Sequence, residues 1–332
     1  MSPRRREDLD EDDVRIRPGK GKSRPRSKER PSHQGAASGF VIAVDRGRYT
    51  CVLDDGDATG PVTAMRAREL GRKGIVVGDR VHLVGDLRGG PDSLARVVRL
   101  EPRTSVLRRT ADDTDPVERV IVANADQLLV VVALADPEPR IGLIDRALVA
   151  AYAGGLTPML CLTKSDLADP SSLLEAYAGL DLPVFVTRRG GELEPLRDLL
   201  RDRSTVLVGH SGVGKSTLVN ALVPDADRSV GVVNAVTGRG RHTSTSAMAL
   251  ALPGGGWVID TPGIRSFGLA HVDADLVLRA FPDLASGTEH CPRGCAHDEA
   301  ECGLDAWVAA GHATPARLES LRRLLRSMSG AE

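Results

Sequence analysis

Short apolar runs divided by turn residues fill the stretch from Gly39 to about Arg103. Asp54-Asp55-Gly56 and Val77-Gly78-Asp79 are turn signals between the runs. The runs are Gly39–Val44, Tyr49–Leu53, Val62–Ala67, Arg80–Val84 and Ala95–Leu100. Five short strands within so few residues predict a small closed barrel of the OB type.

Barrels of this type bind single-stranded or structured nucleic acid on one face. Basic residues that could supply such a face are Arg46, Arg48, Arg66, Arg68, Arg72 and Lys73. We therefore predict that residues 39–108 form an OB-fold RNA-binding domain. A barrel that serves only as an adaptor is the alternative, because this segment holds two aromatic residues for base stacking.

After Arg109 the pattern changes to apolar strands alternating with amphipathic helices. Predicted strands are Gln127–Leu134, Pro158–Leu162, Pro183–Val186, Thr205–Val208 and Trp257–Ile259, and predicted helices are Leu143–Ala153, Ser171–Ala178 and Leu193–Asp202. Such alternation is typical of an α/β fold with a mostly parallel sheet covered on both faces. Past Phe267 the chain turns helical, with leucines at helical spacing from Leu318 to Leu325.

A phosphate-binding loop lies between the strand Thr205–Val208 and the helix Ser216–Leu222. It matches the pattern G-x-x-x-x-G-K-[ST] and comprises Gly209, His210, Ser211, Gly212, Val213, Gly214, Lys215 and Ser216, with Thr217 following. The glycines let backbone N–H groups surround the phosphates at a helix N-terminus. Lys215 is expected to reach the β- and γ-phosphates as a catalytic group, and Ser216 is expected to hold Mg²⁺.

Two further segments are expected at the phosphates. Asp260-Thr-Pro-Gly263 follows an apolar strand, so the Asp260 carboxylate could hold Mg²⁺ and the Gly263 N–H could meet the γ-phosphate. Between this segment and the phosphate loop lies 238–245, which is rich in glycine and hydroxyl groups. Thr243 or Thr245 is expected to close on Mg²⁺, and the sequence does not choose between them.

A base-binding motif comes first in the chain. Thr163-Lys164-Ser165-Asp166 follows a strand and is similar to the Asn-Lys-x-Asp motif of GTPases, whose Asp accepts two hydrogen bonds from guanine. Thr163 stands where that motif has Asn. Val186-Thr187, at the end of the next strand, is a candidate for the last base-contacting loop. Because this motif precedes the phosphate loop, the predicted GTPase domain is circularly permuted.

Three cysteines and one histidine within twelve residues suggest a metal site. Cys291, Cys295, His297 and Cys302 offer four ligands, which suits one structural, tetrahedral Zn²⁺ per chain. His290 is a less favoured substitute. The alternative is a set of reduced cysteines near a surface histidine.

Charge and length add limits. The 332 residues carry a net charge of −1, so overall charge identifies no partner. Residues 1–38 hold eleven Arg or Lys and seven Asp or Glu without apolar periodicity, which predicts a disordered leader that either attracts RNA weakly or has no role.

No targeting segment is visible, and the longest apolar stretch, Leu128 to Ala135, is too short to span a bilayer. We expect a cytoplasmic protein with no membrane contact, and a monomer.

Barrel, permuted GTPase and cysteine knuckle together resemble the RsgA (YjeQ) family over residues 39–328. Further segments that carry the resemblance are 74–80, 124–127, 238–245 and 260–263. The resemblance implies a GTPase that binds the small ribosomal subunit and its rRNA late in assembly and leaves after GTP is hydrolysed to GDP. The knuckle spacings are one residue tighter than usual.

The resemblance also suggests a catalytic histidine. Ras-like enzymes orient the attacking water with a Gln where this chain has Ile264. His242 is similar to the residue that positions water in the family, and Arg239 and Arg241 could stabilise charge. The domains expected are therefore the leader 1–38, the barrel 39–108, the GTPase 109–268 and a helical zinc segment 269–332. Alternatives are an ATP-using kinase or ATPase and an RNA-binding module that holds nucleotide only structurally.

Overall fold

The computed structural model of this chain describes residues 33–54, 60–71, 74–90, 93–110, 118–224, 247–261, 267, 269, 272–299 and 301–328. Contacts divide the chain into two units, 1–33 and 34–332. Residues 1–32 are not described, so the disorder expected for the leader 1–38 stays a prediction there, whereas Ala37 and Ser38 already belong to the first strand. Every helix and strand named here belongs to the second unit.

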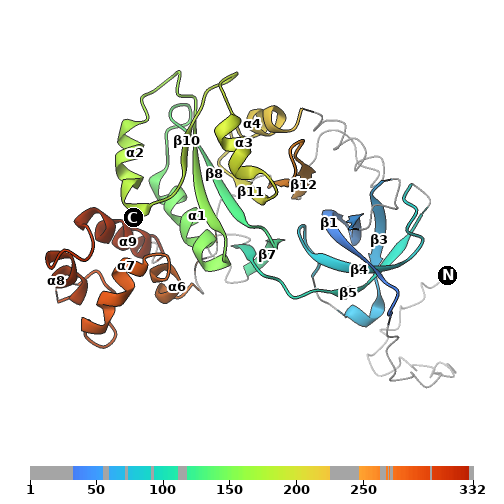
Figure 1. Cartoon of the computed structure of the whole chain (residues 1–332), viewed down its shortest axis with the longest axis horizontal. Helices are drawn as coiled ribbons and strands as arrows, with labels where there is room; N and C mark the ends of the chain where they lie inside the picture. Colours follow the sequence, from blue (N-terminus) through green and yellow to red (C-terminus); the bar gives the residue numbers. More distant parts are fainter. Residues whose placement is uncertain are drawn as a thin grey trace, which may run out of the picture. The chain divides into compact units, whose positions relative to one another are not determined.

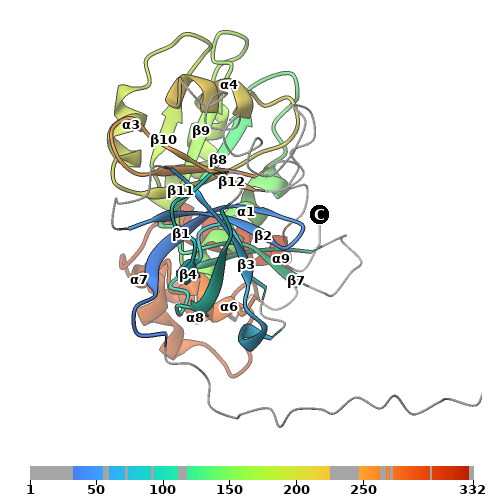
Figure 2. The ribbon, with the colours of Figure 1, turned by 90° about the vertical axis from the view of Figure 1, so that its right-hand side faces the viewer.

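Five strands close a small barrel (Figure 2). They are β1 (Ala37–Asp45), β2 (Arg48–Leu53), β3 (Val62–Arg66), β4 (Arg80–Gly85) and β5 (Ala95–Leu100). The strand order is β1-β2-β3-β5-β4, and β4 pairs back onto β1, so the sheet has no open edge. Alternate residues such as Val81 and Leu83 are fully buried in its interior. The predicted OB-like barrel is confirmed.

A mostly parallel sheet follows. Its strands are β8 (Gln127–Ala133), β9 (Thr157–Thr163), β10 (Val184–Val186), β11 (Ser204–Val208), β12 (Met248–Ala251) and β13 (Trp257–Asp260). Their order is β10-β9-β8-β11-β13-β12, and β12 runs antiparallel to β13. Each predicted strand is present within a residue or two of its expected ends. The β12 strand also meets β1 of the barrel, where Ala43 faces Met248.

Helices cover both faces of this sheet (Figure 1). The helices α1 (Ile141–Gly154) and α2 (Ser171–Tyr177) lie on one face, and α3 (Glu194–Leu200) and α4 (Lys215–Leu222) lie on the other. Side chains along β8 alternate between the two sides: Leu128 and Val130 pack with α1, whereas Leu129 and Val131 pack with α3 and α4. A continuous apolar run is therefore needed here, because both faces of the strand are buried.

The C-terminal segment is helical, as predicted. It contains α6 (Ala274–Leu278), α7 (Pro282–Ala285), the 3-10 helix η4 (Ser286–His290), α8 (Gly303–Ala309) and α9 (Pro315–Met328). Leu318, Leu321 and Leu324 of α9 are buried in the core shared with α1. Arg323 adds an ion pair to α1, since its Nε lies 3.0 Å from Asp145 Oδ2. The segment thus packs directly on the GTPase sheet's helical layer.

The sequence did not predict three features. The strands β6 (Val106–Thr110) and β7 (Glu118–Ala123) form a separate hairpin, and β12 was missed. The β6 segment has only two apolar residues, and alanines in β12 favour helix intrinsically, so tertiary pairing decided both. Two short 3-10 helices, η2 (Arg68–Leu70) and η3 (Ala178–Leu180), complete the described elements. The domain boundaries remain a prediction.

The family segments 74–80 and 124–127 meet beside this hairpin. Asn124 Nδ2 donates to Gly78 O at 3.0 Å, and Ala123 N donates to Val77 O at 3.0 Å. A Cβ on Gly78 would lie 1.8 Å from Ala123 O, and the Gly78 φ is +93°, so only glycine allows this close approach. These two segments therefore join the barrel to the start of the GTPase sheet.

Candidate nucleotide site and metal centre

The candidate nucleotide residues gather at one edge of the sheet. The base motif begins at Thr163, the last residue of β9, the phosphate loop follows β11, and Asp260 is the last residue of β13. The three strands run parallel in the sheet, with β8 between β9 and β11, so their carboxyl ends lie on the same side. Ligands of open α/β sheets bind in the crevice outside these ends. The topology thus brings together motifs that are far apart in sequence.

The phosphate loop connects β11 directly to α4. Gly209 passes so close to β8 that a Cβ there would lie 2.6 Å from Val131 O. Gly214 caps α4 with a φ of +91°, and Lys215 is the first residue of the helix. Ser211, Gly212, Ser216 and Thr217 are exposed, so the mouth of the loop is open to a ligand. This arrangement points the free N–H groups of the α4 N-terminus at that opening.

Lys215 and Asp260 face each other across the site. The Lys215 ammonium forms an ion pair with Asp260 Oδ1, and the side chain of Lys215 is only 11% exposed. The adjacent Thr261 hydroxyl donates to Leu207 O at 2.6 Å, which fixes the end of β13 to β11. An ammonium and a carboxylate are therefore held side by side at the phosphate loop. The ammonium suits a phosphate, and the carboxylate suits the Mg²⁺ that is bound to that phosphate.

The base motif is anchored to its surroundings. Thr163 is buried, and its hydroxyl donates to Val213 O in the phosphate loop at 2.6 Å. The Lys164 ammonium donates to the carbonyl of Asp136. Asp166 is exposed, which leaves its carboxylate free to accept hydrogen bonds from a ligand. The Thr163 hydroxyl thus connects the base motif to the phosphate loop, at the position where the usual motif has the side-chain amide of Asn.

A cavity of about 290 Å³ lies between the base motif and α4. The residues that line it include Lys164, Asp166, Thr187, Gly190, Gly214 and Thr217. It therefore connects the base motif with the phosphate loop, as one bound nucleotide requires. A second hollow of about 30 Å³ lies behind the phosphate loop near Phe267 and has room for about two water molecules. The larger cavity is the one that fits a purine base.

Sequence reasoning missed part of this cavity. Residues 188–191 follow β10 and line it, although only Val186-Thr187 was considered. The backbone fixes this loop to the base motif, since Ser165 N donates to Thr187 O at 3.2 Å. The available signal was the position of the loop, because it too follows a parallel strand at the same edge.

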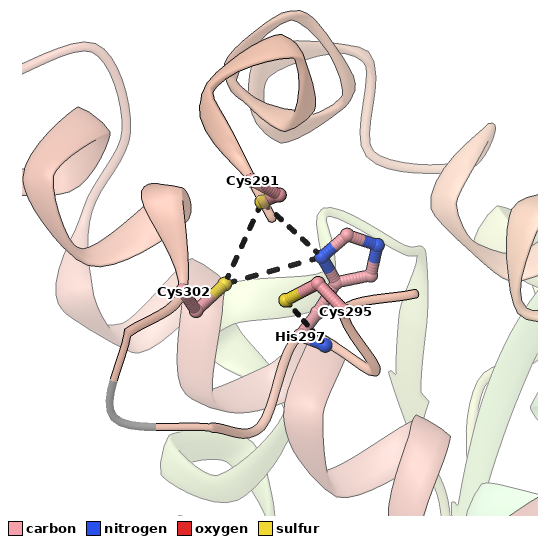
Figure 3. A group of neighbouring side chains, drawn as sticks. All are labelled: Cys291, Cys295, His297 and Cys302. Carbon is pink, nitrogen blue, oxygen red and sulfur yellow. Dashed lines mark hydrogen bonds between the residues drawn. The ribbon is translucent and has the colours of Figure 1, made fainter. Parts of the chain in front are cut away.

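The four predicted metal ligands converge in the C-terminal segment (Figure 3). Cys291 Sγ lies 3.6 Å from His297 Nδ1 and 3.9 Å from Cys302 Sγ. The four ligand atoms, including Cys295 Sγ, all lie within 4.8 Å of one another. Zn–S bonds of about 2.3 Å in a tetrahedron place two sulfurs about 3.8 Å apart, which these distances match. The residues therefore fit a metal ion that prefers tetrahedral coordination.

The alternative ligand is not part of this cluster. His290 is exposed and its ring lies 5.9 Å from that of Trp307, whereas His297 is buried with the cysteines. Burial and the Glu299 carboxylate raise the pKa of the Cys295 thiol to about 12, and burial also raises the pKa of Cys291. Thiolates at this position therefore need a cation nearby to offset their charge.

Several predicted site residues lie outside the described residues. They are His242, Thr243, Thr245, Gly263 and Ile264, together with Arg239 and Arg241. Arg72 and Lys73 of the barrel also fall outside. In the described part of the chain, no helix combines the length and apolar character needed to cross a membrane.

The fold and the site define a class of protein: a P-loop GTPase whose base motif precedes its phosphate loop, flanked by a barrel and a cysteine-rich helical segment. Solved structures of the same architecture support this class. The crystal structure of YjeQ from Thermotoga maritima superposes with a TM-score of 0.63 at 26% identity, over 89% of this chain and 99% of that chain. YloQ, described as a circularly permuted GTPase, shares the fold with a TM-score of 0.64 at 23% identity, over 92% and 99%.

The family model for the RsgA GTPase matches residues 100–270. The chain is 40% identical over 264 residues to the small ribosomal subunit biogenesis GTPase RsgA of Pseudomonas aeruginosa, covering 76% of each chain. It is 37% identical over 305 residues to the protein of that name from Azotobacter vinelandii, covering 89% of this chain and 87% of that one. The chain belongs to the RsgA GTPase family, and it is a GTP-hydrolysing enzyme.

Proposed function

We propose that this GTPase acts in late maturation of the small ribosomal subunit, binding the subunit and its rRNA and leaving after hydrolysis of GTP. The observation that supports this most is the joint placement of base motif, phosphate loop and Asp260 around one cavity, in a chain 40% identical to a relative named for small-subunit biogenesis. The cytoplasm is the expected location, since ribosomes are assembled there.

We assign the nucleotide contacts as follows. The Asp166 carboxylate accepts hydrogen bonds from guanine, and the N–H groups of the phosphate loop hold the phosphates. Lys215 neutralises the β- and γ-phosphates. Ser216 and Asp260 would hold Mg²⁺, which supplies positive charge to the transferring phosphoryl group. An ATP-using enzyme is less favoured, because adenine offers Asp166 no matching pair of donors.

We propose that His242 positions the attacking water, and this role rests on the sequence alone. Ile264 carries no group that could orient water, so hydrolysis by the isolated protein is expected to be slow. Arg239 and Arg241 are candidates for stabilising charge, and Thr243 or Thr245 for closing on Mg²⁺ with Gly263 on the γ-phosphate.

We propose Zn²⁺ as the metal of the Cys291, Cys295, His297 and Cys302 cluster. Three thiolates and one imidazole are ligands that zinc prefers, and four protein ligands leave no open position for catalysis. Its role is therefore structural, and it holds the loop between η4 and α8.

RNA is the partner we propose for the barrel. Arg48, Met65 and Arg96 lie opposite one another on neighbouring strands and are all exposed. Two arginines with an apolar side chain between them suit a ribose–phosphate backbone. We expect the protein to act as a monomer on one subunit.

The test is GTP hydrolysis measured with purified small subunits, with large subunits and without ribosomes. Small subunits are expected to accelerate turnover at least about tenfold, roughly 1.4 kcal/mol of barrier, and higher salt should weaken the effect. His242→Ala should lose most of the stimulated rate and keep its affinity for GTP. Unchanged turnover at low salt would refute the assembly function. Full stimulation of the variant would refute only the role of His242.

A further inference from the structure

Arg322 of α9 lies next to the cysteine-rich cluster and donates to the backbone of one of its four members. Its Nε donates to His297 O at 2.8 Å. Its two terminal nitrogens donate to the Asp305 carboxylate at 3.0 and 2.7 Å. The side chain is only 16% exposed, although it carries a full charge. One guanidinium therefore holds the chain on both sides of Cys302, since His297 precedes this cysteine and Asp305 follows it in α8.

His297 has a backbone conformation that its contacts must hold. Its φ is +65°, in the left-handed region, which costs a residue with a side chain about 1–2 kcal/mol. Its N–H donates to Cys295 Sγ at 3.3 Å, and its Nδ1 lies 3.6 Å from Cys291 Sγ (Figure 3). Its carbonyl accepts the bond from Arg322. Bonds to both backbone groups of His297 therefore keep the imidazole turned toward the sulfurs.

We propose that Arg322 is a positioning residue for the metal site, which it serves by holding the ligand His297. The inference rests on the Zn²⁺ site of the proposed function, and it needs neither a nucleotide nor a ribosomal partner. Without Arg322 the His297 carbonyl can turn, and the residue can relax to a negative φ that moves the imidazole away from the sulfurs. Groups that orient a metal ligand typically change the metal affinity about 10–100-fold.

The positive charge of Arg322 also suits this site. Three thiolates and a neutral imidazole around a divalent ion leave one net negative charge in a partly buried cluster. Asp305 raises the pKa of the Arg322 guanidinium, and the Cys302 sulfur raises it further. The guanidinium therefore lies close enough to Cys302 to offset part of that negative charge.

The experiment measures the Kd for zinc by competition with a chromogenic chelator, using the full chain with its cysteines reduced. Arg322→Met keeps much of the apolar stem and removes the donors, so we expect the Kd to rise at least about tenfold. Arg326→Met is the matched control on the next turn of α9. Arg326 is 42% exposed and bonds to Asp298 and Glu319, which are not ligands, so its removal should change the Kd less than about twofold.

Asp305→Asn separates the positioning of His297 from simple packing of α8 on α9. It removes the charged partner, which is 48% exposed, but leaves Arg322 Nε on the His297 carbonyl, so the Kd should rise less than about threefold. Cobalt supplies a second readout, because its visible bands report tetrahedral coordination by sulfur and nitrogen. At equal cobalt occupancy these bands should change in Arg322→Met and stay unchanged in Asp305→Asn.

Two results would overturn the inference: equal effects of Arg322→Met and Asp305→Asn, or a Kd and a cobalt spectrum of Arg322→Met that match those of Arg326→Met. Either result leaves the zinc site of the proposed function intact. An unchanged protein that binds neither metal would overturn the zinc site and this inference together. If Arg322→Met does not fold, Arg322→Lys takes its place, because one ammonium cannot hold both His297 O and Asp305, and its Kd should still exceed that of Arg326→Met.

Discussion

One buried ion pair, Asp79 with Arg103, lies beside the segment that joins the barrel to the GTPase sheet. Asp79 is fully buried, and its carboxylate accepts hydrogen bonds from Arg103 Nε at 2.7 Å, Arg103 Nη2 at 2.8 Å and Val76 N at 2.8 Å. Hydrogen bonding to this carboxylate raises the pKa of the Arg103 guanidinium above its usual value. Arg103→Met keeps most of the apolar stem and removes both charged contacts. Asp79 would then keep only the Val76 N–H.

The expected cost follows from burial. Removing one partner of a buried pair leaves an uncompensated charge and costs about 3–5 kcal/mol. The Arg103 side chain is 22% exposed, so water can partly replace it, and we expect the lower end, about 3 kcal/mol. Each 1.36 kcal/mol is a factor of ten, so opening of the barrel should become about a hundredfold more frequent.

Amide hydrogen exchange measures this directly. Peptides from β1 and β4 should exchange about a hundredfold faster in Arg103→Met, whereas peptides from β9 should change less. Arg201→Met is the control, because Arg201 and its partner Asp198 are 54% and 64% exposed and such pairs contribute about 0–1 kcal/mol. If both variants exchange alike in β1 and β4, the Asp79 pair does not stabilise the barrel.

Three shorter predictions concern the nucleotide and metal sites. Asp166→Asn should weaken GTP binding strongly, because the amide cannot accept both guanine hydrogen bonds; an unchanged Kd would remove Asp166 from the base site. Lys215→Ala should lower turnover about a hundredfold or more, since it removes positive charge from the transferring phosphoryl group, and near-normal turnover in a pure preparation would refute this role. Purified protein should contain about one zinc per chain, and Cys302→Ser should lose it and expose the 291–302 loop to protease; metal analysis without zinc would end the assignment.

Local patterns were enough for the elements of regular structure. Apolar alternation in the barrel and continuous apolar runs in β8 and β9 predicted both sheets, because burial on one face or on two leaves a direct trace in the sequence. The β6 strand left no such trace, and the short apolar run of β7 was not predicted as a strand. The fully buried residues of this hairpin, Leu107 and Val122, find their partners only when the chain is folded.

The candidate sites divide in the same way. Motif spacing by itself identified the phosphate loop, the base motif and the four metal ligands, since each lies within a few residues of chain. Tertiary structure decided what no local segment contains: that Lys215 pairs with Asp260 forty-five residues away, that residues 188–191 line the base cavity, and that the Thr163 hydroxyl reaches Val213. These contacts depend on strand order, and strand order is fixed by packing between segments that are distant in sequence.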